Sequence, residues 1–322
     1  MDPALNEIFC QNSFDRALCQ PCLRIVLFGV ELTASPGLAS PIKAFIKHFG
    51  DQVAWYLDGF HQSTPKRLTK EKSIEVFVKM QTEIMRPKGA VAALMGASKK
   101  GEWRTPAFHY WKSGGISAPF VMMSLPIEWL NNVGVNGVRM FLREIMLDDF
   151  PLLSGYVGPS ILLNDSFLSD VTLLSDSFRK WLTRYPGLMH PIPLAQIDFA
   201  RNGLVDIGWI TLLGSALAEK INGGEQLLTK ISADLRSGIK IEKFSNGELA
   251  IQAGAMPILG DLALNDFPVL QKEVGAALAS LRDSRESTSL FVPGFSTDEV
   301  DESRSQWVNR FFSERNPTRH LS

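Results

Sequence analysis

Histidine and cysteine, the residues that most often carry catalysis or bind metals, are scarce in this sequence. The 322 residues include 5 His and 3 Cys, and no two histidines have the HExxH spacing of a zinc protease. The GxSxG elbow of an α/β-hydrolase is missing, and so is the GxxxxGK(S/T) loop that binds phosphates. The sequence therefore predicts no catalytic residue, no metal site and no cofactor, and we expect a protein that is not an enzyme.

An excess of charge of one sign is also missing. With 33 basic and 34 acidic residues, the formal net charge is −1. A general nucleic-acid-binding protein carries a basic face or tail, and an acidic mimic of DNA would show the opposite imbalance. The balance argues against both classes, so no direct nucleic-acid partner is expected. Charge that is segregated on one local surface is compatible with this total.

Long apolar runs are missing as well. None reaches the roughly 18–20 residues that a membrane-spanning helix requires, and the N-terminus carries acidic residues where a signal peptide has a basic region. The cysteines are Cys10, Cys19 and Cys22, an odd number that suggests reduced thiols. We therefore expect a cytoplasmic protein with no membrane partner.

The pair Cys19 and Cys22 forms a CxxC pattern. A zinc site needs four ligands, and Cys10 supplies only a third. A redox CxxC follows a strand and opens a helix, whereas this pair precedes the strand expected at residues 23–32. Incidental thiols are therefore the favoured interpretation.

The order of the expected elements indicates the fold class. An irregular segment at residues 1–22 precedes a strand-rich lobe at residues 23–163 and a helix-rich lobe with a β-hairpin at residues 164–322. Strands followed by helices indicate an α+β fold, with helices packed on mostly antiparallel or mixed sheets. We expect two intimately packed lobes, and a single large domain is the alternative.

Hydrophobic periodicity places the elements of the first lobe. Strands are expected at residues 23–32, 53–57, 106–112, 118–125 and 152–163, and the strands at 106–112 and 118–125 are expected to pair. Helices are expected at residues 42–49, 69–85 and 137–148, while residues 90–94 fit either state. The expected buried face of the helix at residues 137–148 carries Val138, Phe141, Leu142 and Ile145. The expected buried face of the helix at residues 69–85 carries Ile74, Phe77, Val78 and Ile84.

The second lobe is expected to begin with a helix at residues 169–184. Helical spacing then predicts a helix at residues 206–221, whose buried face carries Ile207, Ile210, Leu213, Leu217 and Ile221. A short helix is expected from Glu225. Asn246-Gly247 predicts a hairpin with a type I′ turn between strands at residues 239–244 and 248–252. The last expected elements are a helix at residues 267–281 capped by Asp266, a strand at residues 288–292 and a helix from Ser296.

Two sets of residues are candidates for contacts with a partner. Trp103 and Trp111 lie near loops or strand ends, and tryptophan is enriched at protein interfaces, although core packing is the commoner role. The acidic run consists of Asp298, Glu299, Asp301 and Glu302. Acids in the first turn of a helix oppose the positive end of its dipole, and the same carboxylates are suited to a basic groove on a partner.

Several short motifs in the second half carry a family resemblance. They include Tyr185-Pro186-Gly187, Trp209, Gly223-Gly224, Gly254, Pro257 and Gly260-Asp261. These motifs resemble the type VI secretion immunity family, long catalogued only as a domain of unknown function. The sequence departs from the family pattern at Met189, where members usually have Asp, and at Gly208, where Asn is usual. The resemblance is clearest over residues 181–281.

The resemblance implies an α+β immunity protein that binds and neutralises a cognate effector toxin of the type VI secretion system. Such toxins include nucleases, and TsiT–TseT is a pair of this kind. Inhibition would be stoichiometric, through a protein–protein complex, and the motif residues would be structural. The alternatives are an adaptor or chaperone that loads an effector, and an enzyme whose active-site residues are dispersed in the sequence.

Overall fold

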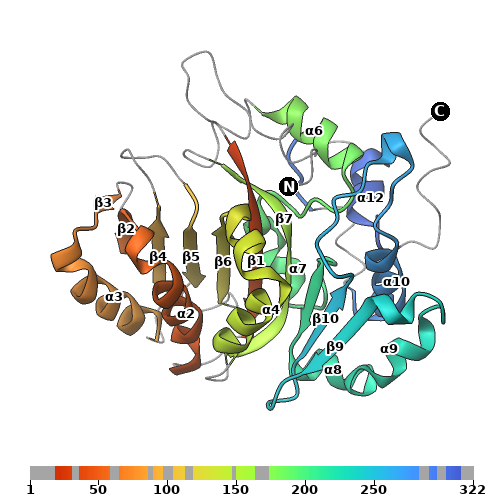
Figure 1. Ribbon diagram of the computed structural model, residues 1–322, viewed down its shortest axis with the longest axis horizontal. Helices are drawn as coiled ribbons and strands as arrows, with labels where there is room; N and C mark the ends of the chain where they lie inside the picture. The colour runs from red at the N-terminus through yellow and green to blue at the C-terminus, as the bar shows by residue number, and fades with distance from the viewer. Residues whose placement is uncertain are drawn as a thin grey trace. The chain divides into compact units, whose positions relative to one another are not determined.

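The structure of the protein is a computed structural model. It describes residues 19–30, 36–58, 65–85, 90–96, 104–112, 119–146, 150–163, 174–282, 290–295 and 302–312. These residues form two compact units (Figure 1). Unit 1 contains the described residues up to Leu152 together with Ile161–Leu163, and unit 2 contains Leu153–Ser160 and the described residues from Leu174 onward. Helices and antiparallel strands occur in both units, which confirms the predicted α+β class.

The strands of unit 1 follow the hydrogen-bonded order β3-β2-β4-β5-β6-β1-β7. Their bounds are β1 Cys19–Gly29, β2 Trp55–Asp58, β3 Lys66–Arg67, β4 Ala90–Met95, β5 Ala107–Lys112, β6 Phe120–Leu125 and β7 Leu152–Leu163. The predicted pairing of β5 with β6 is confirmed, with Tyr110 opposite Val121. Residues 90–94, which fitted either state, belong to a strand because their backbone pairs with both β2 and β5.

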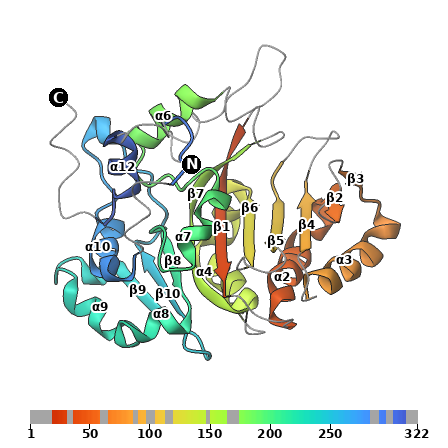
Figure 2. The ribbon, with the colours of Figure 1, turned by 180° about the vertical axis from the view of Figure 1, so that it is seen from behind.

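Three helices cover one face of these strands (Figures 1 and 2). They are α2 Ser40–Phe49, α3 Lys70–Ile84 and α4 Ile127–Met146. Aromatic rings join α2 to α4: the centroid of Phe49 lies 5.4 Å from that of Trp129, and Trp129 lies 5.5 Å from Phe141. The face predicted for residues 137–148 is confirmed, because Val138 and Phe141 are fully buried.

The predicted buried face of α3 is wrong at Ile74 and Val78, whereas Ile84 is buried as predicted. Ile74 is 75% exposed and Val78 is 58% exposed, while Val76, Met80 and Ile84 point into the core. Two apolar stripes run along this helix, and both satisfy the spacing of neighbouring turns. Contact with the rest of unit 1 selects the stripe that starts at Val76, a choice that periodicity within the helix does not encode.

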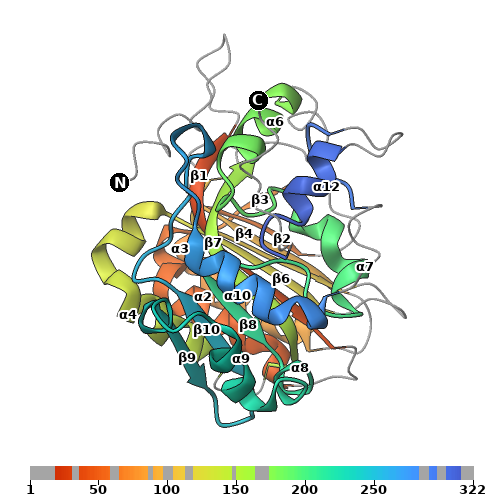
Figure 3. The ribbon, with the colours of Figure 1, turned by 90° about the vertical axis from the view of Figure 1, so that its right-hand side faces the viewer.

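Unit 2 contains the strand order β7-β8-β10-β9, with antiparallel neighbours throughout. The three new strands are β8 Ile210–Leu213, β9 Ile239–Lys243 and β10 Leu249–Ala253. The helices are α6 Ser175–Arg184, α7 Ile197–Ala200, α8 Ser215–Glu219, α9 Glu225–Lys230, α10 Val269–Leu278 and α12 Glu302–Val308. Figure 3 shows α10 crossing β8 and β10, and Val274 and Leu278 share a buried cluster with Ile251.

The helix predicted at residues 206–221 is wrong, because this stretch forms β8 and then the short α8. Ile210 and Thr211 are β-branched, and β8 pairs with β7 on one side and β10 on the other. Gly208 permits a close backbone approach, since a Cβ there would lie 2.5 Å from the Val157 carbonyl oxygen. The apolar pattern therefore correctly indicated that these residues are buried. Pairing with a strand on each side made residues 210–213 a strand instead of a helix.

The predicted hairpin is confirmed, but its turn type is wrong. Residues of β9 and β10 pair in register, and the Gly247 N–H donates to the Phe244 carbonyl at 3.1 Å. Gly247 has φ 88°, whereas Asn246 is not among the described residues with positive φ. The Phe244 N–H in turn donates to the Glu248 carbonyl at 2.9 Å. This pattern is a type I turn closed by a left-handed glycine and a bulge.

Three smaller expectations also need correction. β1 begins at Cys19, so the CxxC pair lies inside the strand and not before it, and both side chains are buried. α10 starts at Val269, and Asp266 forms a bridge with Asp261 instead of capping the helix. Residues 290–292 are not a strand, and residues 288–289 lie outside the described part. Cys10 and residues 296–301, where the last helix was expected to begin, also lie outside it.

Candidate functional site

Motif residues from distant parts of the sequence meet in unit 2. The segment around Gly187 lies against the segment that precedes Gly260, and the Gly187 N–H donates to the Leu259 carbonyl at 2.7 Å. A Cβ on Gly187 would lie 2.0 Å from the Ile258 carbonyl oxygen. Only glycine permits this approach of two backbones. The Tyr-Pro-Gly and Gly-Asp motifs thus form one joint.

An ion pair holds this joint. Arg184 Nε lies 3.0 Å from both carboxylate oxygens of Asp261, and Arg184 Nη2 lies 2.7 Å from Oδ2. Asp261 also accepts the Ala263 N–H at 3.0 Å, which caps the short 3₁₀ helix η6, Leu262–Leu264. Hydrogen bonds from Arg184 hold the pKa of Asp261 below its usual value. A bidentate, charge-assisted contact fixes direction as well as distance, so the elbow after Gly260 is rigidly set.

A second guanidinium ties the end of the described chain to the same joint. Arg310 donates from Nε to the Pro186 carbonyl at 2.7 Å and from Nη1 to the Trp307 carbonyl at 3.0 Å. Its Nη2 lies 3.0 Å from a carboxylate oxygen of Asp206, and both side chains are buried. Burial raises the pKa of Asp206, while Arg310 opposes that rise. The pair therefore depends on both partners being present.

Trp209 forms a second set of contacts that holds the chain after β10. The indole is fully buried, and its N–H donates to the Gly254 carbonyl at 3.1 Å. The side-chain amide of Gln252 donates to the same oxygen at 2.8 Å, and the Ala253 N–H donates to the Trp209 carbonyl at 2.8 Å. Gly254 has φ 92°. These contacts fix the reversal of the chain after β10, which leads through the half-buried Pro257 to Gly260.

The remaining glycine motif is a turn between α8 and α9. Gly223 and Gly224 have φ 62° and 93°, values that disfavour side chains with a Cβ. A Cβ on Gly224 would lie 3.3 Å from Ile241 Cγ2 and 3.4 Å from Leu249 Cδ1. The glycines therefore bring this turn close to β9 and β10.

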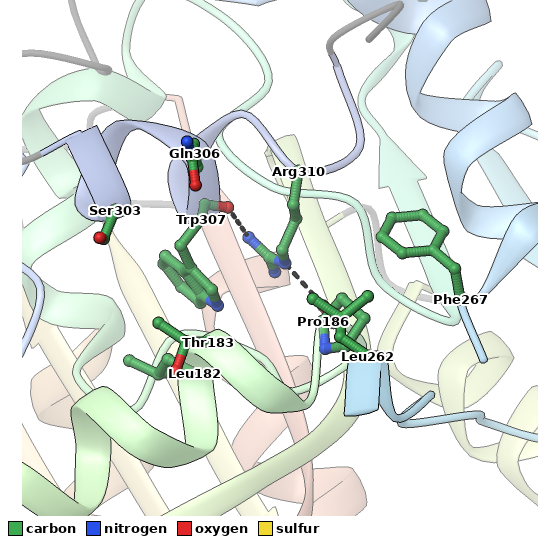
Figure 4. A pocket seen from close by; sticks show the side chains of 9 residues that line it. All are labelled: Leu182, Thr183, Pro186, Leu262, Phe267, Ser303, Gln306, Trp307 and Arg310. Carbon is green, nitrogen blue, oxygen red and sulfur yellow. Dashed lines mark hydrogen bonds between the residues drawn. The ribbon is translucent and has the colours of Figure 1, made fainter. Parts of the chain in front are cut away.

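The contacts described above hold the segment from Gly254 to Val269, which we call the braced segment. Two hollows open beside it, and Phe267 lines both. The smaller hollow, of ≈ 50 Å³, lies between α6, η6 and α12, and its lining side chains are drawn in Figure 4. The larger hollow, of ≈ 210 Å³, is lined by side chains that include Ile258, Val269 and Leu270. The surface is mainly apolar, with hydroxyl and amide groups of α12 at one edge.

Of the six residues predicted to contact a partner, the structure describes Glu302 and Trp111. Glu302 is exposed at the start of α12 and accepts a hydrogen bond from Gln306 at 3.3 Å. Trp111 is half-buried in β5 of unit 1, in register with Val91 and Phe120. Trp103, Asp298, Glu299 and Asp301 lie outside the described residues. The proposed role of all these residues stays a prediction.

Sequence reasoning missed the residues that shape this surface: Asp206, Phe267, Trp307 and Arg310. Asp206 and Arg310 are 104 positions apart, so no local spacing could have paired them. An aspartate between Val205 and Ile207 was the available signal, because an acid in an apolar run needs a buried partner.

Four further observations concern the described histidines, metal binding and membrane-spanning helices. His190 is buried, and its ring nitrogens bond the Ile192 N–H and the Phe291 carbonyl at 3.0 Å each. Burial lowers the pKa of His109 to about 3. Within the described ranges, no group of three His, Cys, Asp or Glu side chains is arranged to hold a metal ion. No described helix is both long and apolar enough to cross a membrane.

The match to a family model defines the class of this protein, which is that of the type VI secretion immunity proteins. The chain belongs to the TsiV family, described as type VI immunity for VRR-NUC, whose family model matches residues 38–311. Its fold is similar to that of a solved structure, the Pseudomonas aeruginosa T6SS protein PA0821. The TM-score is 0.74 at 18% identity, and the match covers 93% of this chain and 84% of that chain. Such identity shows the fold alone. No match was found among curated proteins.

Proposed function

We propose that this protein neutralises a cognate VRR-NUC effector by forming a stoichiometric complex with it. The observation that carries the proposal is membership of the TsiV family over residues 38–311. The structure supports a binding role for the motif region, because Gly187, Trp209 and Asp261 use their backbone and polar groups to brace a surface. A braced surface binds with little loss of conformational entropy.

Electrostatics favour an encounter with a nuclease. Proteins that bind nucleic acids contact phosphates through Lys and Arg, so the substrate groove of a nuclease is basic. Glu302 is exposed at the start of α12, and Asp298, Glu299 and Asp301 precede it in the sequence. Complementary charges at the rim of an interface raise the association rate more than the affinity. These acids would thus speed the capture of the toxin, and buried apolar contacts would hold it.

An inhibition titration tests the proposal. Purified protein is added to the VRR-NUC effector at a fixed concentration far above the dissociation constant, and cleavage of plasmid DNA is measured. Activity should fall linearly and reach zero near equimolar protein, because mass action governs a stoichiometric inhibitor. Full protection at a few per cent of the effector concentration would indicate an enzyme instead. Binding without loss of nuclease activity would indicate a loading adaptor.

Charge reversal tests the electrostatic part. The variant with Asp298, Glu299, Asp301 and Glu302 changed to Lys should associate more slowly and show a flatter dependence on salt. Glu75→Lys is the matched control, since Glu75 is an exposed acid on α3 in unit 1. Equal association rates for the wild type and the quadruple variant would rule out a role for the acidic run.

A further inference from the structure

We infer that the two hollows joined by Phe267 form one docking surface that anchors an apolar segment of the effector. This Phe267 surface comprises Ile258, Leu262, Phe267, Val269 and Trp307, which line the hollows. The inference rests on the proposed function, because that function supplies the partner. Beyond that function, the Phe267 surface is the part of the molecule that would hold the effector, and the contact would be mainly apolar.

Large apolar side chains are exposed on the segment that leads from β10 to α10. Between residues 256 and 269, Met256, Ile258, Leu264 and Val269 are 43–74% exposed. Single exposed apolar residues are common on any protein, but a group of them around a hollow marks an interaction site. Gly254 and Gly260 have positive φ, and the Arg184–Asp261 pair fixes the elbow. The segment is therefore held in a conformation that keeps these side chains at the surface.

The shape of the hollows also suits a partner's side chain. Interfaces concentrate their binding energy in a few side chains that fill recessed, desolvated pockets. Ile258 and Val269 are both exposed and both line the larger hollow, so an inserted side chain would remove them from water. At ≈ 210 Å³ this hollow holds many times the roughly 10–15 Å³ that one water requires. The smaller hollow, at ≈ 50 Å³, has room for a few atoms.

The smaller hollow contains an unsatisfied hydrogen-bond donor. Trp307 is buried, and its indole N–H has no hydrogen-bond partner in the described part of the structure. Figure 4 shows the indole directed from α12 toward Leu182 and Thr183. A buried donor without an acceptor is unfavourable. An acceptor oxygen that enters this hollow with the effector segment would satisfy it.

The charge around the smaller hollow selects the kind of acceptor. Arg310 lines it, but its guanidinium is already bonded to Asp206, the Pro186 carbonyl and the Trp307 carbonyl. The cation is therefore neutralised, and Glu302 is exposed one residue before Ser303, which lines the hollow. A carboxylate would meet this acid, and Arg310, the cation among the described residues that line the hollow, is already paired. We therefore assign the donor to a neutral carbonyl or amide oxygen.

The same charges select the effector over a second copy of the chain. In a symmetric dimer the same patch faces itself, so the acidic start of α12 would lie near its own image. Asp266, beside Phe267, is also exposed, and the Asp261 carboxylate is paired with Arg184. Lys272 lies over the Phe267 ring at 5.9 Å as the neighbouring cation. An apolar centre beside an acidic helix start fits a partner with a basic groove.

Paired variants test the inference. Ile258→Lys/Val269→Lys places two charges in the larger hollow, and Ile74→Lys/Val78→Lys makes the same change at exposed apolar residues of α3 in unit 1. The dissociation constant for a catalytically inactive VRR-NUC effector is measured by calorimetry for both variants and the wild type. The unit 2 variant should raise it by at least about 30-fold. The unit 1 variant should change it by less than about 3-fold.

A conservative variant tests the donor. Trp307→Phe keeps the ring but removes the N–H, so the melting temperature should stay the same or rise, because a buried unsatisfied donor is lost. The dissociation constant should rise by about 3- to 10-fold, the effect of one neutral hydrogen bond. If Ile258→Lys/Val269→Lys fails to fold, the dissociation constant of Trp307→Phe still tests whether the effector docks at this surface.

The outcomes separate this inference from the function on which it rests. A wild-type protein that neither binds nor inhibits the effector overturns the proposed function. If the wild type inhibits and the unit 2 variant binds equally well, the docking surface lies elsewhere. Equal weakening by both double variants also overturns the assignment. A wild-type dimer that the unit 2 variant dissociates, with effector binding intact, would assign the surface to self-association instead.

Discussion

We expect Gly187→Ala to destabilise the protein far more than a single added methyl group normally does. The new Cβ would lie 2.0 Å from the Ile258 carbonyl oxygen and 2.8 Å from the Leu259 carbonyl oxygen. Ordinary van der Waals contact begins near 3.4 Å. The obstructing atoms belong to the backbone, so no side-chain rotation relieves the overlap. The two segments of the joint must move apart.

The magnitude follows from what that separation disrupts. Forcing a backbone shift in a packed interior costs about 1–3 kcal/mol. The movement also weakens the hydrogen bond from the Gly187 N–H to the Leu259 carbonyl, which is 2.7 Å long, and one such bond contributes about 0.5–1.5 kcal/mol. The expected loss is therefore about 2–4 kcal/mol in the free energy of unfolding.

Urea unfolding followed by circular dichroism measures this loss. Gly50→Ala is the control, because a Cβ on Gly50 would approach its nearest neighbour, Ile46 Cγ2, at 3.4 Å and meet no backbone. The control should change the unfolding free energy by less than about 0.5 kcal/mol. If Gly187→Ala is as stable as the control, the Tyr-Pro-Gly and Gly-Asp motifs do not approach each other this closely.

Four further outcomes are expected. Trp209→Ala should lower the unfolding free energy by about 3–5 kcal/mol because the indole is fully buried; an unchanged thermal melt would contradict this. Gly247→Val should lower the melting temperature, since φ is 88° there and β-branched residues disfavour positive φ. Arg310→Met should cost about 3–5 kcal/mol by leaving Asp206 buried without its cation, and Asp206→Leu/Arg310→Met should recover most of it in urea titrations.

The fourth is a dependence on pH. The folded pKa of Asp206 is raised above 3.8, so the native state binds its proton more tightly than the unfolded state does. Its contribution to stability is therefore fully favourable below pH 3.8 and is lost as the pH rises through the folded pKa. Asp206→Asn should remove this part of the pH dependence. Identical curves of unfolding free energy against pH for the wild type and the variant would contradict the expected contribution of Asp206.

Local signals predicted the elements that depend on neighbouring residues. The hairpin of β9 and β10 was predicted because Asn246-Gly247 separates two short alternating runs, and the pairing of β5 with β6 followed from a similar pattern. The buried face of α4 was also correct, since a single apolar stripe that includes Phe141 left no choice.

Long-range contacts decided what the sequence patterns did not. Residues 210–213 have helical spacing, yet pairing with both β7 and β10 makes them a strand. α3 carries two stripes, and the interior selected the one with Met80. In the candidate site, the motif glycines were visible in the sequence. The Asp206–Arg310 pair was not, because its partners come from segments 104 residues apart.

The course of β7 limits how this protein can be divided. Residues Leu153–Ser160 belong to unit 2, whereas Leu152 and Ile161–Leu163 belong to unit 1. A fragment that begins at residue 164 would therefore lack the strand that pairs with β8 from Ser154 to Val157. It would also lose the Tyr156 hydroxyl that donates to Gln196 at 2.6 Å. The helix-rich part is thus not an independent piece of sequence, because one of its strands lies before residue 164.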